Sequence, residues 1–217
     1  MKARIRDFFE TKQGWIFAVA DYNCSQGLRS LLRYVPDPSG ERMANNRRYR
    51  KMDFDESFEY LLRERPDYVR DLHVDPETDV ARIFRPNEGL KTVMEKDPRV
   101  KKIVSILVRG GVPLNEMGIT GSMLIGLQSS SSDIDFVVYG PWWWMARDIL
   151  AAAKAKGEVQ DLDEDTWKKI YLKRNPETGI DEFMIHEKRK GNRGMVSGTY
   201  FDLLFTLGVI LAAAVFL

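Results

Sequence analysis

The pattern of apolar and polar residues near the start of the chain predicts a small domain rich in β-strands. Residues 3–22 alternate between polar and apolar positions on either side of a polar turn at residues 12–14, which indicates a β-hairpin. A further apolar segment at residues 29–34 runs into the proline- and glycine-containing residues 36–40, which predict a turn. Residues 41–54 are polar and basic, and a solvated loop is the simplest interpretation of them.

A helix and a connector are expected to follow these strands. Apolar residues recur at helical spacing within residues 55–69, and Pro66 is expected to break that helix. Residues 75–88 have the composition of a connector. We therefore divide the chain into a small β-rich N-terminal domain at residues 1–80 and a second domain at residues 86–217.

Helical periodicity is clearest at the start of the second domain. Asp97 is a suitable N-cap, Pro98 suits the first helical position, and apolar residues recur on one helix face as far as Leu107. The pair at residues 110–111, both glycine, is expected to end this helix. An alanine-rich helix is predicted after Pro141, and it begins with three adjacent tryptophans, of which at least one must be partly exposed.

Two aspartates are expected to share one face of a strand that lies between these helices. Successive residues of a strand point to opposite faces, so Asp133 and Asp135 lie together, opposite Ile134. Two neighbouring carboxylates repel each other and lose hydration, which becomes favourable when a divalent cation lies between them. Rigid oxygen ligands suit Mg²⁺ or Mn²⁺ better than zinc. Upstream, the turn Gly121-Ser122 is placed to offer backbone N–H groups to phosphate oxygens.

This arrangement resembles the nucleotidyltransferase superfamily typified by DNA polymerase beta, in which a Gly-Ser turn is followed about a dozen residues later by Asp-x-Asp. The sequence around these residues also resembles a set of largely archaeal proteins that contain this domain. The resemblance implies an α+β fold with a small mixed β-sheet flanked by helices. It also implies a third metal-binding carboxylate on a neighbouring strand, and Asp202, within the apolar run 199–205, is carried over to that role.

The same resemblance implies a reaction. Two Mg²⁺ or Mn²⁺ ions held by Asp133, Asp135 and Asp202 would promote transfer of a nucleoside monophosphate from a nucleoside triphosphate to an acceptor hydroxyl, with release of pyrophosphate. The acceptor is left open among RNA, a protein and a small molecule. The residues expected to contact the nucleotide are Gly121, Ser122, Ser132, Lys188, Arg189 and Arg193.

Several features admit a structural explanation beside a functional one. The basic residues within 41–54 belong either to a solvated loop or to a phosphate contact. The run at residues 188–193 is either the solvated face of a hairpin or a phosphate clamp near Asp202. The acidic residues 161–165 lack the glycine and glutamate of a calcium loop and are expected to cap a helix. The three tryptophans are explained by core packing or, less simply, by base stacking.

Two further functions stay open. One is a catalytically idle nucleotide- or RNA-binding module of the same fold. The other is a minimal nucleotidyltransferase of the toxin or antitoxin kind, which the additional N-terminal domain makes less suitable.

Composition limits which cellular compartment and which binding partners are expected. A net charge of +1 over 217 residues provides no overall attraction to nucleic acid. The single cysteine, Cys24, excludes an internal disulfide, and the start of the chain lacks the pattern of a secretion signal, so a cytoplasmic location is expected. Residues 203–217 are uncharged but fall short of the roughly 20 residues of a membrane-spanning helix. This favours a buried strand and core helix over a membrane-associated tail or an altered terminus.

Overall fold

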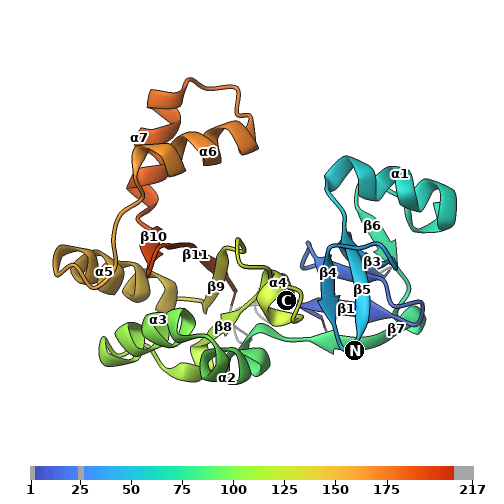
Figure 1. The fold of residues 1–217 in the computed structure, drawn as a ribbon, viewed down its shortest axis with the longest axis horizontal. Helices are drawn as coiled ribbons and strands as arrows, with labels where there is room; N and C mark the ends of the chain where they lie inside the picture. Colours follow the sequence, from blue (N-terminus) through green and yellow to red (C-terminus); the bar gives the residue numbers. More distant parts are fainter. Residues whose placement is uncertain (1–2, 24–26, 208–217) are drawn as a thin grey trace.

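The computed structural model describes residues 3–23 and 27–207 as two β-sheets with helices packed around them (Figure 1). The α+β class is therefore confirmed. Cys24 and the core helix that we expected near the carboxyl end, after residue 207, lie outside the described residues.

The first sheet contains seven strands, in the order β4-β5-β3-β2-β1-β7, with β6 paired to β3 outside this path. These strands are β1 (Phe8–Thr11), β2 (Ile16–Val19), β3 (Leu28–Pro36), β4 (Arg42–Ala44), β5 (Arg47–Lys51), β6 (His73–Asp75) and β7 (Val80–Phe84). The predicted hairpin is formed by β1 and β2, which pair antiparallel. Helix α1 (Phe54–Glu64) follows β5, and the short 3₁₀ helix η1 (Pro66–Tyr68) begins at the expected proline.

Two segments of this sheet differ from the prediction. Strand β7 pairs with β1, and together with the 3₁₀ helix η2 (Glu77–Asp79) it occupies residues that we expected to form a connector. The basic segment expected to be a solvated loop is the β4–β5 hairpin. Its turn consists of Asn45 and Asn46, whose φ angles are +49° and +61°. Asparagine tolerates this left-handed conformation, which two-residue hairpin turns require.

The second sheet is small and mixed. Its order is β10-β11-β9-β8, in which β9 and β11 run parallel while the two outer pairs are antiparallel. Its strands are β8 (Met117–Ile119), β9 (Ile134–Tyr139), β10 (Arg193–Val196) and β11 (Thr199–Thr206). The 3₁₀ helix η3 (Leu114–Glu116) precedes β8, and the short helix α4 (Gly121–Leu124) follows it.

Three helices cover one face of this sheet. They are α2 (Pro86–Lys96), α3 (Pro98–Arg109) and α5 (Trp142–Ala155), and their apolar residues pack with Ile134, Phe136 and Val138 in the largest core of the molecule. Asp97 accepts a hydrogen bond from the Arg99 backbone N–H, which confirms it as the N-cap of α3. Trp144 is exposed, as the run of three tryptophans requires.

Helices α6 (Glu164–Arg174) and α7 (Ile180–Lys190) form a hairpin above the second sheet in the view of Figure 1. The carboxylate of Asp163 accepts from the Thr166 N–H at 2.7 Å, so the acidic segment caps α6 as predicted. The basic run at residues 188–190 forms the last turn of α7 rather than the face of a β-hairpin. Positive side chains at this end of a helix are favoured by its dipole.

An apolar cluster joins the two sheets. Phe8, Tyr34 and Tyr49 of the first sheet pack with Ile125 and Leu127, which follow α4. The buried contact means that the first sheet is packed directly against the loop that connects α4 to β9. No helix in the described part of the chain is long and apolar enough to cross a membrane.

We predict that this cluster makes the two sheets unfold together. Leu127 is fully buried, so Leu127→Ala is expected to lower the free energy of unfolding by about 2–5 kcal/mol. Leu172→Ala provides the matched control, because Leu172 is 74% exposed. Denaturant unfolding followed by circular dichroism and by tryptophan fluorescence should give one shared transition; two separate transitions would contradict the prediction.

Candidate active site

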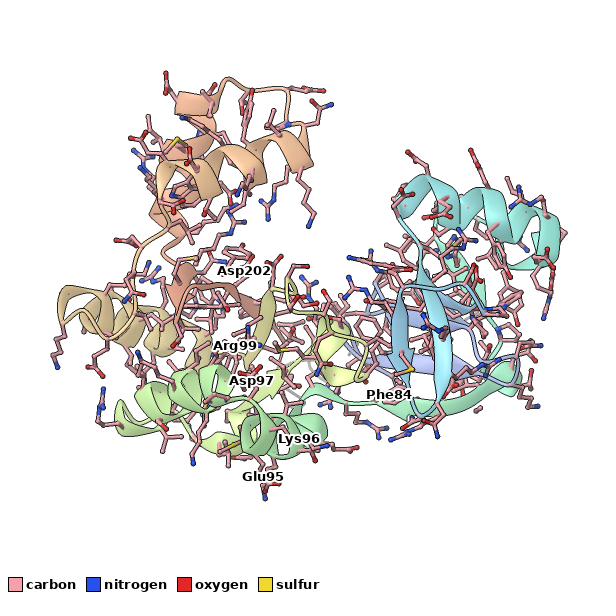
Figure 2. The ribbon with its side chains drawn as sticks, viewed as in Figure 1. Phe84, Glu95, Lys96, Asp97, Arg99 and Asp202 are labelled. Atoms are coloured by element: carbon pink, nitrogen blue, oxygen red, sulfur yellow. The ribbon has the colours of Figure 1, made fainter. Side chains whose placement is uncertain are left out.

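Parallel pairing brings two of the predicted carboxylates together. Asp135 on β9 is the direct cross-strand partner of Asp202 on β11. Cross-strand partners lie on the same face of a sheet, so both point away from the core that contains Ile134 and Phe136. Asp133 immediately precedes β9 and is exposed, whereas Asp202 is buried. Figure 2 shows Asp202 on the second sheet, below the hairpin of α6 and α7.

Gly121 lies directly against the Asp135 side chain. The turn is fixed by a hydrogen bond from the Thr120 N–H to the Asp135 carbonyl oxygen at 2.9 Å. A Cβ atom at Gly121 would overlap Oδ2 of Asp135, and the φ angle of +67° also favours glycine. The glycine therefore allows the turn that contains Ser122 to approach the carboxylate.

The Asp202 carboxylate is held by three neighbours. Its Oδ1 accepts from Asn192 Nδ2 at 2.6 Å, and its Oδ2 lies 3.3 Å from both Arg193 Nε and the Tyr200 hydroxyl. The buried Arg193 guanidinium also forms an ion pair with Glu187 on α7. Arg193 thus lies between Asp202 and the helical hairpin, and it neutralises part of the acidic charge.

Electrostatic interactions couple the three carboxylates. The pKa of Asp135 is raised to about 6, mainly by burial and additionally by the negative charges of Asp202 and Asp133. Desolvation also raises the pKa of Asp133. Among residues 3–23 and 27–207, no group of three or more His, Cys, Asp or Glu side chains is close enough to hold a metal ion. The donor chemistry nevertheless fits a hard divalent cation, because a cation stabilises ionised carboxylates such as Asp135, whose pKa the neighbouring negative charges raise.

Basic side chains from three separate parts of the chain act electrostatically on these carboxylates. Arg6 and Lys173 lower the pKa of Asp135, and Lys173 and Lys51 lower that of Asp133. The Arg6 carbonyl oxygen accepts from the Thr120 hydroxyl at 2.7 Å, which places the start of the chain beside the Gly121 turn. Our sequence analysis missed Arg6 and Lys173, since no local pattern distinguishes either residue from an ordinary surface cation.

The predicted nucleotide-binding residues divide into two groups. Gly121 and Ser122 adjoin Asp135, and the loop containing Ser132 leads into Asp133. Arg193 contacts Asp202 and, together with Lys188, lines a cavity of about 300 Å³ beneath the helical hairpin. Arg189 is exposed in the last turn of α7. Lys188, Arg189 and Arg193 therefore lie on the side of the site that contains Asp202. Arg193, the most buried of the three, is already paired with the carboxylates of Asp202 and Glu187.

Comparison with known proteins identifies the family of this chain. Residues 98–190 match the family described as Nucleotidyltransferase domain, a region that extends from α3 to α7 and includes Gly121, Asp133 and Asp135. The chain is also 38% identical to an uncharacterised protein of Methanocaldococcus jannaschii, over 95% of this chain and 68% of that protein. No solved structure matches it significantly.

The mixed sheet, the Gly-Ser turn and the Asp-x-Asp strand define the class of protein. This chain belongs to the nucleotidyltransferase superfamily, which confirms the resemblance inferred from its sequence.

We predict that Gly121→Ala impairs divalent-cation binding while Gly126→Ala does not. Both glycines have positive φ angles, +67° and +73°, so both substitutions should cost about 1–2 kcal/mol of stability. Only at Gly121 does a Cβ meet Asp135, because a Cβ at Gly126 would meet no atom within 4 Å. Calorimetric titration with Mn²⁺ measures the difference; equal affinities in the two variants would show that the contact is unimportant.

We also predict that ionisation of Asp135 destabilises the protein when no metal is bound. A carboxyl whose pKa rises from 3.8 to about 6 on folding contributes stability below its unfolded pKa and loses it as pH rises through the folded value. The shift corresponds to about 3 kcal/mol.

Urea unfolding in EDTA between about pH 4 and pH 7 tests this sign. The stability of Asp135→Asn relative to the wild type should increase as pH rises, because asparagine carries no ionisable proton. Addition of Mg²⁺ should reverse the difference at neutral pH, since the cation would stabilise the ionised wild-type side chain. A difference that does not change with pH would contradict the prediction.

Proposed function

We propose that this protein transfers a nucleoside monophosphate from a nucleoside triphosphate to an acceptor hydroxyl and releases pyrophosphate. The observation that carries the proposal is the direct pairing of Asp135 with Asp202 across β9 and β11. Asp133 lies two residues before Asp135, and the charges of Asp133 and Asp202 both raise the pKa of Asp135. All three acidic side chains therefore act on the same region of the sheet. Membership of the superfamily supports the class of reaction.

Asp133, Asp135 and Asp202 would hold two Mg²⁺ or Mn²⁺ ions. Such ions, when bound, neutralise phosphate charge and favour deprotonation of the attacking hydroxyl. The acceptor oxygen attacks the α-phosphorus in line, a new P–O bond forms, the hydroxyl proton passes to solvent water, and the bond to the leaving pyrophosphate breaks. The acceptor belongs to an RNA, a protein or a small molecule.

The chain's own residues position these groups. Gly121 leaves room for the Asp135 carboxylate, so the backbone at Ser122 can meet the phosphates of the donor. Arg193 and Asn192 restrict the orientation of Asp202, and Glu187 in turn holds Arg193. A metal-binding carboxylate that is already held in one orientation loses less entropy when it binds a cation. Residues that support a reactive site are expected to have this effect.

One observation favours the alternative, a catalytically idle module of the same fold. Asp202 already interacts with Asn192, Arg193 and Tyr200, which use three of the roughly four acceptor positions of a carboxylate. In an idle module these contacts would serve stability alone, and nucleotide binding would not depend on Asp202.

We predict that Asp135→Asn and Asp202→Asn each reduce transfer by at least about 100-fold with folding intact, because each removes charge that stabilises the transition state. Asp148→Asn is the control, since Asp148 is exposed and pairs only with the neighbouring Arg147 among the described residues. Calorimetry with each nucleoside triphosphate, with and without Mg²⁺, measures binding. Incubation of α-labelled nucleotides with cellular RNA and with cellular protein measures transfer.

The outcomes separate the two functions. Metal-dependent binding that Asp135→Asn abolishes, together with labelled product, supports nucleotidyl transfer. Binding without labelled product in either fraction supports the idle module, whereas full transfer by Asp202→Asn would remove that residue from the site.

A further inference from the structure

The Arg193 guanidinium is shared between two buried carboxylates. Arg193 is the cross-strand partner of Asp202, and its Nε lies 3.3 Å from Oδ2 of that residue. Its Nη1 forms an ion pair with Glu187 in the last turn of α7. Arg193 and Glu187 are only 4% and 6% exposed, so salt and water screen this pair weakly. A cation between two carboxylates neutralises whichever of them it lies nearer.

The contact with Arg193 limits what Asp202 can bind. Oδ2 of Asp202 lies 3.3 Å from both Arg193 Nε and the Tyr200 hydroxyl. A divalent cation would compete with the guanidinium for this oxygen, because both carry positive charge and both need its lone pairs. Asp202 is therefore expected to bind a metal ion most tightly when Arg193 is drawn away from it.

Glu187 is surrounded by charge that keeps it ionised. It forms ion pairs with Arg193, with Lys190 on its own helix and with Arg174 of α6, the last at 3.2 Å. Burial alone would raise the pKa of Glu187, but Lys190, Arg193 and Arg174 outweigh burial and hold the pKa below its usual value. Glu187 therefore carries the charge that attracts the Arg193 guanidinium at neutral pH.

The surroundings leave room for the guanidinium to shift between its two partners. Glu187 and Arg193 both line the cavity of about 300 Å³ beneath the helical hairpin. The guanidinium carbon of Arg193 lies 5.7 Å from the centre of the Trp167 ring, and a planar aromatic face supports a cation in more than one position. A small movement toward Glu187 would therefore not disturb the main core.

The helical hairpin has an apolar core of its own. Leu162, Trp167 and Phe183 are buried together, and Met195 of β10 and Tyr200 of β11 pack against them. These contacts fix the hairpin to the second sheet independently of the Glu187 charge. Removal of that charge is therefore expected to change the electrostatics at Asp202 more than the fold.

We propose that Glu187 is a positioning residue that sets the metal affinity of Asp202 through Arg193. The ion pair with Glu187 draws the guanidinium away from Asp202, which leaves that carboxylate better able to accept a divalent cation. The helical hairpin thereby acts on the candidate active site without contributing a metal ligand. This inference rests on the proposed function and deepens it, because it names a residue beyond the three aspartates that controls one of them.

Calorimetric titration of the full chain with Mn²⁺ tests the proposal. Glu187→Gln preserves the size of the side chain but removes its charge, so Arg193 should pair more fully with Asp202 and Mn²⁺ binding should weaken about tenfold. Arg193→Gln should have the opposite effect and tighten binding, because the competing cation is gone while Asn192 still orients the carboxylate. In the Arg193→Gln background, Glu187→Gln should change the affinity little. Glu182→Gln is the control, since Glu182 is exposed on the same helix.

The sign of the Arg193→Gln effect separates this proposal from a purely structural role. Weaker Mn²⁺ binding by Arg193→Gln would overturn the proposal, and so would an equal effect of Glu187→Gln with and without Arg193. Urea unfolding shows whether each variant is folded; if Glu187→Gln is not, Arg193→Gln alone decides the question.

Failure of this inference and failure of the proposed function give different results. If the wild type transfers nucleotide and Glu187→Gln binds Mn²⁺ normally, the inference alone is wrong. If the wild type binds no Mn²⁺, with or without a nucleoside triphosphate, the proposed function fails and this inference fails with it.

Discussion

The parallel pairing of β9 with β11 is the interaction on which the rest of the site depends. It aligns Asp135 with Asp202 and places Ile134, Phe136 and Leu203 on the opposite face, in the core that α3 and α5 help to form. Burial of that face fixes the register, because a shift of one residue would turn the carboxylates into the core. The energy of the apolar core is thereby used to hold acidic side chains together despite their mutual repulsion, which is reflected in the raised pKa of Asp135.

Contact between the two sheets connects the N-terminal domain directly to the region of the three aspartates. Ile125 and Leu127 are buried by residues of the first sheet, and the Arg6 carbonyl oxygen accepts a hydrogen bond from Thr120. Arg6 has a φ angle of +75°, which is costly for a residue other than glycine and therefore indicates that the surrounding contacts determine its conformation. The loop around the Gly-Ser turn is consequently supported from both sides, by its own sheet and by the first one.

Local sequence signals were sufficient for the elements that carry strong periodicity or caps. The N-cap at Asp97, the cap at Asp163 and the strand containing Asp135 all follow from neighbouring residues, and the mixed sheet follows from the resemblance. Strand β7 was missed because its residues are partly exposed and its partner β1 lies about seventy positions away. The Asn45-Asn46 turn was a usable signal for the β4–β5 hairpin that we did not apply. The electrostatic effect of Lys173 on the pKa of Asp133 and Asp135 depends on tertiary packing, which no short sequence pattern records.

The order of events in folding follows from the separation of the two carboxylate strands along the chain. Asp135 and Asp202 meet across a parallel ladder, and α5, α6, α7 and β10 all lie between β9 and β11. A parallel pair with so long an intervening segment loses more chain entropy on closure than a hairpin such as β1–β2. We therefore expect Asp135 and Asp202 to come together late in folding, after the local hairpins and helices have formed. In that order the aspartates stay hydrated and apart until the apolar core is able to oppose their mutual repulsion.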